Sequence, residues 1–280
     1  MIITNTIPYF QNNYQPSLTF IRQYHEEYPD IFKEYFTGHC ANTDERFLQA
    51  IERYEEHFTD IDKLSRILPP LIEEVATSYQ KEYEFDFPIN INLIVGGFGS
   101  NAYTHKQIIP DITFCLERLP TTQDELRILI AHEFGHHTHM KLTDLSGIDW
   151  YQKDWFHPFT TLNQEGVATY LSKKIEPHHA DYMYLAVNQE DEHWYQFALD
   201  HKKALIHAFY EDYQRLTPLE MFKEWFSING GTRFGYARFG YVIALFFFED
   251  LVFTNGEQEA IIYWREQDYF SHVEQWFLNQ

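Results

Sequence analysis

Two histidines and a glutamate near the middle of the chain have the types and spacing that a hydrolytic metal site requires. They are His132, Glu133 and His136, an HExxH pattern inside an apolar run that begins at Leu126. Residues that are four apart on an α-helix lie roughly 40° apart around its axis, so both imidazoles can reach one small cation. Glu133 projects from the flank, where it can take a proton from a metal-bound water. The pattern therefore predicts a metal site that activates water.

The residues before the motif favour a real helix over a chance match. Thr122 and Glu125 form a capping-box pattern just ahead of the apolar run, and Pro120 precedes them. With 15 His and many Glu in the chain, chance HExxH matches occur at a rate of roughly a few per cent. Histidine and glutamate are costly to bury among Leu, Ile, Ala and Phe without partners, and a metal ion would be such a partner. His137 and His139 lie at other angles on this helix and are expected to be surface or supporting residues.

Composition limits the classes of protein to consider. The chain has 280 residues, of which 44% are hydrophobic and 18% aromatic, so it can bury a sizeable core and is not largely disordered. Its net charge of −21 would repel a phosphate backbone, which argues against nucleic-acid binding. The two cysteines, Cys40 and Cys115, have no CxxC spacing, so neither a disulfide framework nor a cysteine metal site is expected.

Nothing in the hydropathy pattern indicates export or membrane insertion. The first ten residues lack a basic region followed by a long apolar one. The most apolar run, Tyr241 to Phe248, is followed at once by Glu249 and Asp250 and is too short to span a bilayer. We therefore expect a cytoplasmic protein with no membrane span.

Periodicity predicts an α+β fold that is mainly helical. Apolar spacings of three and four indicate helices over residues 17–82, with breaks at Pro29, at 38–44 and at 60–62. Residues 88–95, 100–104 and 111–116 are expected to form a small antiparallel sheet before the HExxH helix, and helical patterns dominate from 161 onward. We predict a helical N-terminal region at 1–85 and a catalytic domain at 86–280, or one continuous domain.

A catalytic zinc usually has three protein ligands, so the class depends on the third. A third histidine six residues after the motif is excluded because position 142 is Leu, and position 139 is His where that pattern has Gly. Asp144 and Asp149 are possible ligands. Glu165 stands out because it opens a second helical stretch, in which Gly166 and Ala168 would permit close packing against the HExxH helix. Its other interpretation is a first-turn acidic residue favoured by the helix dipole.

The order of a sheet, an HExxH helix and a helix that begins Glu165-Gly-Val-Ala168 resembles the gluzincin peptidases. These are the thermolysin-like metallopeptidases with a glutamate as third ligand. More narrowly, the chain resembles a bacterial family described only as predicted Zn-dependent proteases. The resemblance covers roughly residues 88–255 and includes a glycine-tyrosine repeat, here Gly235-Tyr236 and Gly240-Tyr241. The repeat is spaced by five residues, whereas the family is expected to have four.

The resemblance implies one Zn²⁺ held by His132, His136 and Glu165, with Tyr236 and Tyr241 as candidates to stabilise an oxyanion. Each tyrosine has the alternative of being an ordinary core or surface aromatic. In thermolysin-like enzymes an aspartate four residues after the glutamate orients a ligand histidine, but here that position is Thr169. A hydroxyl brings no charge, so weaker metal affinity or activity is expected unless another carboxylate substitutes.

These features predict a zinc-dependent peptidase in which Glu133 is the general base and peptides or proteins are the substrates. Residues 100–103 are either an edge strand that pairs with an extended peptide or an ordinary turn and strand. Two other functions stay open: an interaction protein that binds metal with little or no catalysis, and a zinc hydrolase of a non-peptide substrate. The sequence leaves the oligomeric state and the substrate undetermined.

Overall fold

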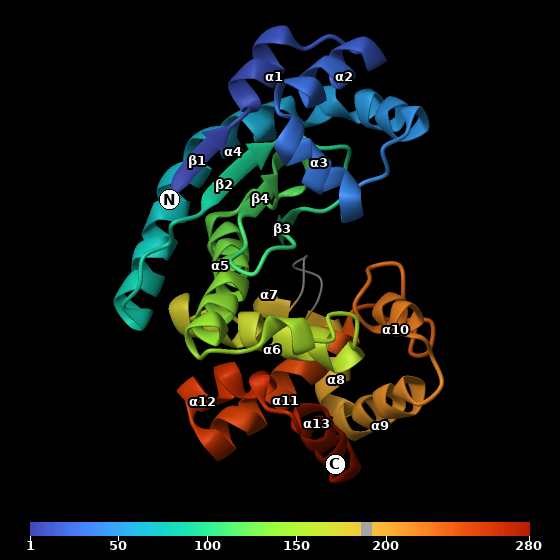
Figure 1. Cartoon of the computed structure of the whole chain (residues 1–280). Helices are drawn as coiled ribbons and strands as arrows, with labels where there is room; N and C mark the ends of the chain where they lie inside the picture. The colour runs from blue at the N-terminus through green and yellow to red at the C-terminus, as the bar shows by residue number, and fades with distance from the viewer. Residues whose placement is uncertain (186–191) are drawn as a thin grey trace. The chain divides into compact units, whose positions relative to one another are not determined.

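The computed structural model describes residues 1–185 and 192–280 and has the predicted mainly helical α+β fold (Figure 1). The chain divides into two compact units, Met1–Glu133 and Phe134–Gln280. The sequence-based boundary near residue 85 stays a prediction.

Unit 1 contains a four-stranded sheet in the order β1-β2-β4-β3. Its strands are β1 (Ile2–Asn5), β2 (Asn90–Ile94), β3 (Ala102–Thr104) and β4 (Ile112–Cys115). Strand β1 is parallel to β2, β2 is parallel to β4, and only β3 is antiparallel to its neighbour. The expectation of an antiparallel sheet is therefore wrong. Long connections precede β2 and β4, as parallel pairing requires, and the short β1 gave no clear sequence signal.

Strand β3 lies at an edge of this sheet. That is the position expected for residues 100–103 if they pair with an extended peptide. The pairing itself stays a prediction.

Four helices contribute many of the buried aromatic residues of unit 1. They are α1 (Ile7–Asn13), α2 (Leu18–Glu27), α3 (Pro29–Gly38) and α4 (Asp44–Tyr83). The predicted breaks at Pro29 and at 38–44 are confirmed, but the break at 60–62 is wrong because α4 continues through it. Ile61 and Leu64 are fully buried there, so their burial outweighs the local turn preference of the flanking aspartates.

The turn after β2 is held by buried side chains that we call the glycine-turn cradle: Tyr35, Tyr54 and Glu117 around Gly96–Gly99. Glu117 accepts hydrogen bonds from the N–H groups of Gly96 at 2.8 Å and Phe98 at 3.0 Å. Tyr35 Oη accepts from Gly97 and Gly99, and Tyr54 Oη donates to the Gly96 carbonyl. Burial raises the pKa of Glu117 to about 7, against the opposing effect of these hydrogen bonds.

Helix α5 (Gln123–Leu145) begins in unit 1 and continues without a break into unit 2. Its predicted start is confirmed, since the Glu125 N–H donates to Thr122 Oγ1 at 3.4 Å and the two side chains are also hydrogen-bonded. Tyr79 of α4 donates to the Ala131 carbonyl at 2.6 Å, which fixes this helix one residue before the motif.

The regular secondary structure in the described residues of unit 2 is helical, with loops between the helices. Its helices are α6 (Pro158–Ile175), α7 (Asp181–Leu185), α8 (Glu192–Asp200), α9 (Lys202–Tyr213), α10 (Pro218–Trp225), α11 (Phe239–Asn255), α12 (Glu257–Ile262) and α13 (Tyr269–Leu278). Helix α11 is buried over most of its length and packs along α6 (Figure 1). The core of unit 2 is therefore built around the α6–α11 pair.

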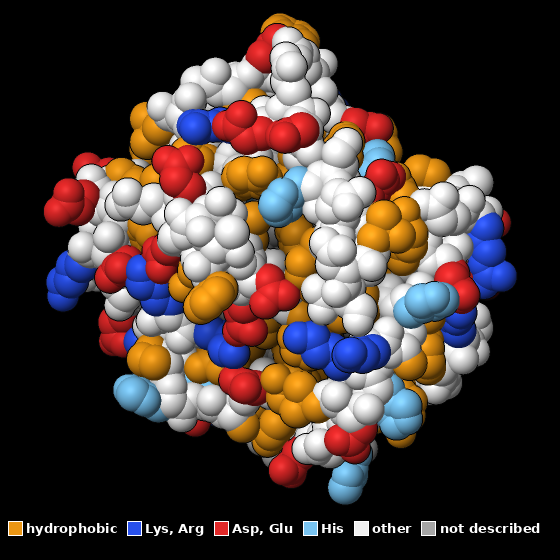
Figure 2. Space-filling model, turned by 90° about the horizontal axis from the view of Figure 1, so that it is seen from below, with side chains coloured by type: hydrophobic (Ala, Val, Ile, Leu, Met, Phe, Trp, Pro, Cys, Tyr) orange, Lys and Arg blue, Asp and Glu red, His pale blue; other side chains and the backbone are white. Residues whose placement is uncertain are grey.

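The described helices include none that is both long and apolar enough to cross a bilayer. On the face shown in Figure 2, acidic and basic side chains lie interspersed, with hydrophobic atoms visible between them. On this face, therefore, acidic and basic side chains are mixed rather than gathered in one patch of either sign.

Candidate metal centre

The two motif histidines lie on a side of helix α5 that is partly exposed to solvent. His132 and His136 are half-buried, whereas Ala131 and Phe134 beside them are fully buried. Glu133 is only 6% exposed. Because the histidines are one helical turn apart, their imidazoles project from the same side of α5.

Glu165 lies well inside α6, in the second turn after Pro158. The expectation that Glu165 opens its helix is therefore wrong. Proline is favoured at the first helical position, and Pro158 starts the helix earlier than the Glu-Gly-x-Ala pattern suggested. The interpretation of Glu165 as a first-turn residue favoured by the helix dipole no longer applies.

The three predicted ligands come together in the structure. The donor atoms of His132, His136 and Glu165 all lie within 4.8 Å of one another, and His136 Nε2 is 3.6 Å from Glu165 Oε2. Zinc bonds of about 2.0–2.2 Å in a tetrahedron separate the ligand atoms by about 3.3 Å. Two imidazoles and a carboxylate at this spacing fit one Zn²⁺ with a coordination position left for water or substrate.

The two alternative third ligands are used elsewhere. Asp144 accepts a hydrogen bond from Trp150 Nε1 at 3.0 Å. Asp149 accepts from the backbone of Tyr151 and the side chain of Gln152, and so caps the short 3₁₀ turn at Trp150–Gln152. Of the three candidates for third ligand, Glu165 is the one that lies in a group with both motif histidines.

Next to the predicted ligands, buried side chains of α5 and α6 contact one another. The side chains of Asn163 and His139 are 3.2 Å apart at Nδ2 and Nε2, and each residue lies within one turn of a predicted ligand. The His139 ring packs on Trp264 at 4.3 Å, and Trp264 Nε1 donates to Thr143 Oγ1 at 2.8 Å. His139 is fully buried, and burial lowers its pKa well below the usual value, so it is a neutral supporting residue.

Sequence reasoning missed Asn163 and Trp264 as parts of these buried contacts. Asn163 lies two residues before Glu165, and that proximity was the one signal that could have identified it. Trp264 is far along the chain and had no local signal. Its place follows from the packing of the 3₁₀ turn Tyr263–Arg265 in unit 2.

Several buried polar atoms near the ligands have no hydrogen-bond partner within the described part of the chain. They are Thr138 Oγ1, Thr169 Oγ1 and Asn163 Oδ1, and all three residues are fully buried. Buried polar groups normally have a partner, so this cluster is typical of a region that binds an ion with its ordered water. The structure records no hydrogen bond from Thr169 to a histidine, and an orienting role for this residue stays a prediction.

Gly166 permits a close helix contact, but with a different helix from the one expected. A Cβ atom at this position would lie 2.5 Å from the Ala244 carbonyl oxygen of α11. The expectation that Gly166 serves packing against the HExxH helix is therefore corrected. The small residue sets the distance between α6 and α11, and it thereby positions Glu165 next to it.

The two candidate tyrosines occupy different environments. Tyr241 is half-buried in the first turn of α11, with its ring 5.7 Å from Phe226 and the Arg238 guanidinium 4.4 Å from its ring centre. It lies one turn before Ala244, the residue that contacts Gly166. Tyr236 is 40% exposed, and its ring lies 5.0 Å from that of Phe197. Tyr241 is therefore the one of the two that lies within one turn of the α6–α11 contact.

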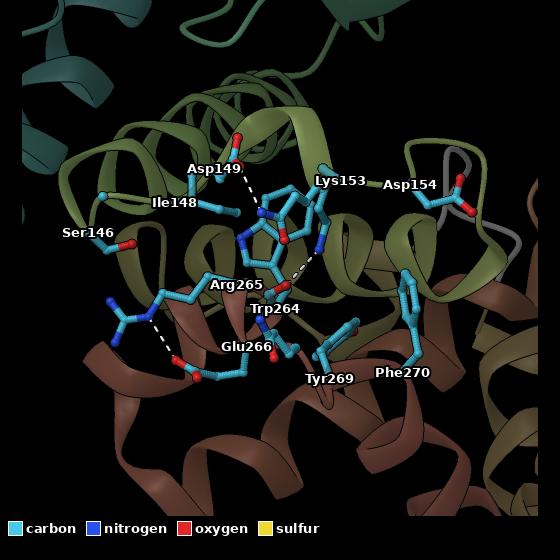
Figure 3. A pocket seen from close by; sticks show the side chains of 13 residues that line it. Ser146, Ile148, Asp149, Lys153, Asp154, Trp264, Arg265, Glu266, Tyr269 and Phe270 are labelled. Atoms are coloured by element: carbon cyan, nitrogen blue, oxygen red, sulfur yellow. Dashed lines mark hydrogen bonds and ion pairs between the residues drawn. The ribbon is translucent and has the colours of Figure 1, made fainter.

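Unit 2 also has a cavity of about 480 Å³ between the α5–α6 connection and the start of α13 (Figure 3). Lys153 reaches into it and donates to the Trp264 carbonyl at 2.7 Å, and its Nζ lies 4.1 Å from the centre of the Trp264 ring. The rings of Tyr269 and Phe270 are also near this amine. Burial lowers the pKa of Lys153 to about 7, against the opposing effect of the nearby Asp154 carboxylate.

The polar groups that line this cavity mostly satisfy one another. Lys153 bonds to Trp264, Arg265 bonds to Glu266, and Asp149 caps its own turn. None of His132, His136 and Glu165 lines the cavity. We therefore interpret the residues around this cavity as structural. They hold the α5–α6 connection against Trp264, and the Trp264 ring packs on His139.

The fold and the ligand geometry together define a mainly helical α+β protein with a candidate zinc site shared by α5 and α6. Residues 10–267 match the family described as "Putative zinc dependent peptidase (DUF5700)", and the chain belongs to that family. This description agrees with the zinc peptidase expected from the sequence. No curated protein and no solved structure matches the chain.

Proposed function

We propose that the protein is a gluzincin-type peptidase that uses one Zn²⁺ held by His132, His136 and Glu165. The observation that carries the proposal is the convergence of these three donor atoms within 4.8 Å on the partly open sides of two helices. Two neutral nitrogen ligands and one carboxylate are a usual donor set for a catalytic zinc, as opposed to a structural one.

Zinc, when bound, lowers the pKa of a water molecule and polarises a carbonyl. Glu133 follows a ligand directly and is 6% exposed, so its carboxylate acts where bulk water is largely excluded. It accepts the proton of the attacking water and delivers that proton to the leaving amine. A general base in this position accounts for the glutamate of the HExxH motif.

Tyr241 is the preferred donor to the oxygen that becomes negatively charged. Its place one turn from the α6–α11 contact supports this role, and its hydroxyl would supply a hydrogen bond in the transition state. Tyr236 is the weaker candidate because it is exposed and packs on another part of unit 2. We expect Tyr241→Phe to lower kcat by about tenfold or more and Tyr236→Phe to leave it nearly unchanged.

Metal analysis of purified protein tests the ligand set. Wild type should bind one zinc per chain, and Glu165→Ala should lose most of it. Gln164→Ala is the matched control, because Gln164 is also half-buried and adjacent on α6 but is absent from the ligand group. Equal zinc content in all three proteins would reject Glu165 as a ligand.

A peptide-library digest tests catalysis. Wild type should cleave peptides, and Glu133→Gln should lower the rate by about 10²- to 10⁴-fold while still binding zinc. Cleavage that survives the substitution would reject Glu133 as the base. Zinc binding without cleavage by wild type would favour the interaction protein, or a hydrolase that acts on another kind of bond.

A further inference from the structure

A second cavity of unit 2, which we call the α10 pocket, is apolar and belongs to no feature described above. Its volume is about 460 Å³. It is lined by Trp155, Phe156, Pro158, Thr161, Thr217, Pro218, Leu219, Phe222 and Phe226. No charged side chain lines it, which distinguishes it from the cavity around Lys153. Its size and lining are those of a site that takes an apolar group.

The rim of the α10 pocket is open. Phe156 is 83% exposed, Leu219 is 78% exposed and Phe222 is 49% exposed. Single exposed apolar residues are common, but several around one cavity mark a contact surface. An incoming apolar side chain would remove this surface from water, which favours binding.

A residue that lines the α10 pocket and the predicted metal ligand Glu165 lie on the same side of helix α6. Over the first three turns of this helix, Thr161, Gln164 and Glu165 are half-buried, and the residues around them are fully buried. Thr161 lines the pocket and lies four residues before Glu165, which is about 6 Å along the helix axis. A chain that presents a bond at Glu165 can therefore place a neighbouring side chain in the pocket.

The walls of the α10 pocket are held in place before any ligand binds. Helix α10 begins with a complete capping box between Thr217 and Glu220, and its Trp225 donates to the buried Asp212 at 3.1 Å. Pro158 and Pro218 each start a helix, which limits the freedom of the backbone at the rim. A preformed pocket loses little entropy on binding, so apolar contact there contributes efficiently to selectivity.

From these observations we infer that the α10 pocket is a specificity site for a large apolar side chain of the substrate, aromatic or leucine-like, close to the bond that is cleaved. The inference rests on the proposed function. Transfer of such a side chain into an apolar pocket corresponds to a preference over alanine of about ten- to a hundredfold in kcat/KM.

The test uses pairs of peptides that differ only by Phe or Ala at one position, scanned across each side of the cleaved bond. Wild type should prefer Phe at one position, and Leu219→Asp should reduce that preference about tenfold, since it places a charge at the rim. Phe253→Asp is the control, because Phe253 is 93% exposed and lies outside the pocket. Cleavage without a preference, or a preference that Leu219→Asp leaves unchanged, would overturn the inference while the proposed function stands.

A binding measurement separates failure of the inference from failure of the proposed function. Labelled peptides of the same pairs are titrated into Glu133→Gln, with and without Leu219→Asp, and fluorescence anisotropy gives Kd. Tighter binding of the Phe peptide that is lost with Leu219→Asp supports the pocket even if wild type cleaves nothing. Equal Kd values for Phe and Ala peptides overturn it. Peptide-independent dimers that Leu219→Asp disrupts would instead assign the pocket to a second copy of the chain.

Discussion

The molecule buries polar groups in two regions, and the two regions differ in how those groups are satisfied. In the glycine-turn cradle, both Glu117 oxygens accept backbone hydrogen bonds and Tyr35 accepts two more. Around the α5–α6 ligands, Thr138 and Thr169 keep buried hydroxyls without a partner in the described chain. A complete network holds a turn in place, whereas an incomplete one is typical of a region that binds something else.

Each region also contains a buried glutamate, and their surroundings suggest different roles. Glu117 is 4% exposed and holds a turn, while Glu133 is 6% exposed and follows a predicted ligand. Burial alone therefore does not identify a catalytic carboxylate. The neighbours of each carboxylate distinguish the structural glutamate from the proposed base.

The largest expected difference is in catalysis by variants of these two residues. We predict that Glu133→Gln lowers kcat/KM by about 10²- to 10⁴-fold with the fold intact, because it removes the proposed general base. Glu117→Gln should leave kcat/KM within about threefold, because its contribution is to stability. Steady-state kinetics on one peptide, with circular dichroism to check folding, measures both. Equal losses of kcat/KM in the two variants would contradict the assignment of a catalytic role to Glu133 and a structural role to Glu117.

The next effect is stabilisation by zinc. Saturating zinc at about a thousand times Kd should raise the free energy of unfolding of wild type by about 4 kcal/mol. The same addition should have little effect on Glu165→Ala, whereas Glu117→Ala should keep the full response. Urea unfolding with and without zinc provides the measurement. A zinc response retained by Glu165→Ala would contradict the ligand assignment.

The cradle should give a pH-dependent contribution to stability. Burial raises the pKa of Glu117 from 4.5 to about 7 in the folded protein. Its stabilising contribution is then complete below pH 4.5 and is lost as pH rises through 7, a change of about 3 kcal/mol. The cost of Glu117→Ala should therefore be larger near pH 4.5 than at pH 8. Urea unfolding of both proteins across this range tests the sign, and a cost that grows with pH would contradict it.

The smallest effect concerns single hydroxyls in metal-free protein. Thr169→Val removes a buried hydroxyl without a partner and should change the free energy of unfolding by less than about 1 kcal/mol, in either direction. Tyr35→Phe leaves the N–H groups of Gly97 and Gly99 without their acceptor and should cost about 2 kcal/mol. Similar losses in the free energy of unfolding for both substitutions would show that buried polar groups are equally well hydrogen-bonded in the two regions.

Local patterns in the sequence were sufficient to predict much of this arrangement. The capping residues Thr122 and Glu125 and the HExxH spacing depend on positions that are close in the chain. Glu165 was singled out from the wrong helix start, yet it does lie in a group with both motif histidines. The strands β2, β3 and β4 were also located correctly, since alternation and β-branched residues are local signals.

What escaped prediction depends on distant partners. The parallel pairing of the short β1 with β2 joins residues that are far apart in the chain. The continuity of α4 through 60–62 reflects tertiary burial of Ile61. The contact of Trp264 with His139 and that of Gly166 with Ala244 each join segments whose spacing in the sequence has no periodic signature.

The Gly166–Ala244 contact has a consequence for how the family can diverge. A side chain at position 166 would overlap the α11 backbone, so its size can increase only if α11 shifts away. Such a shift would also move Tyr241, which lies one turn before Ala244. Among homologues, we therefore expect glycine at position 166 to persist, or its replacements to accompany compensating changes near position 244. Evolution of the candidate metal centre would then proceed through coordinated pairs of substitutions.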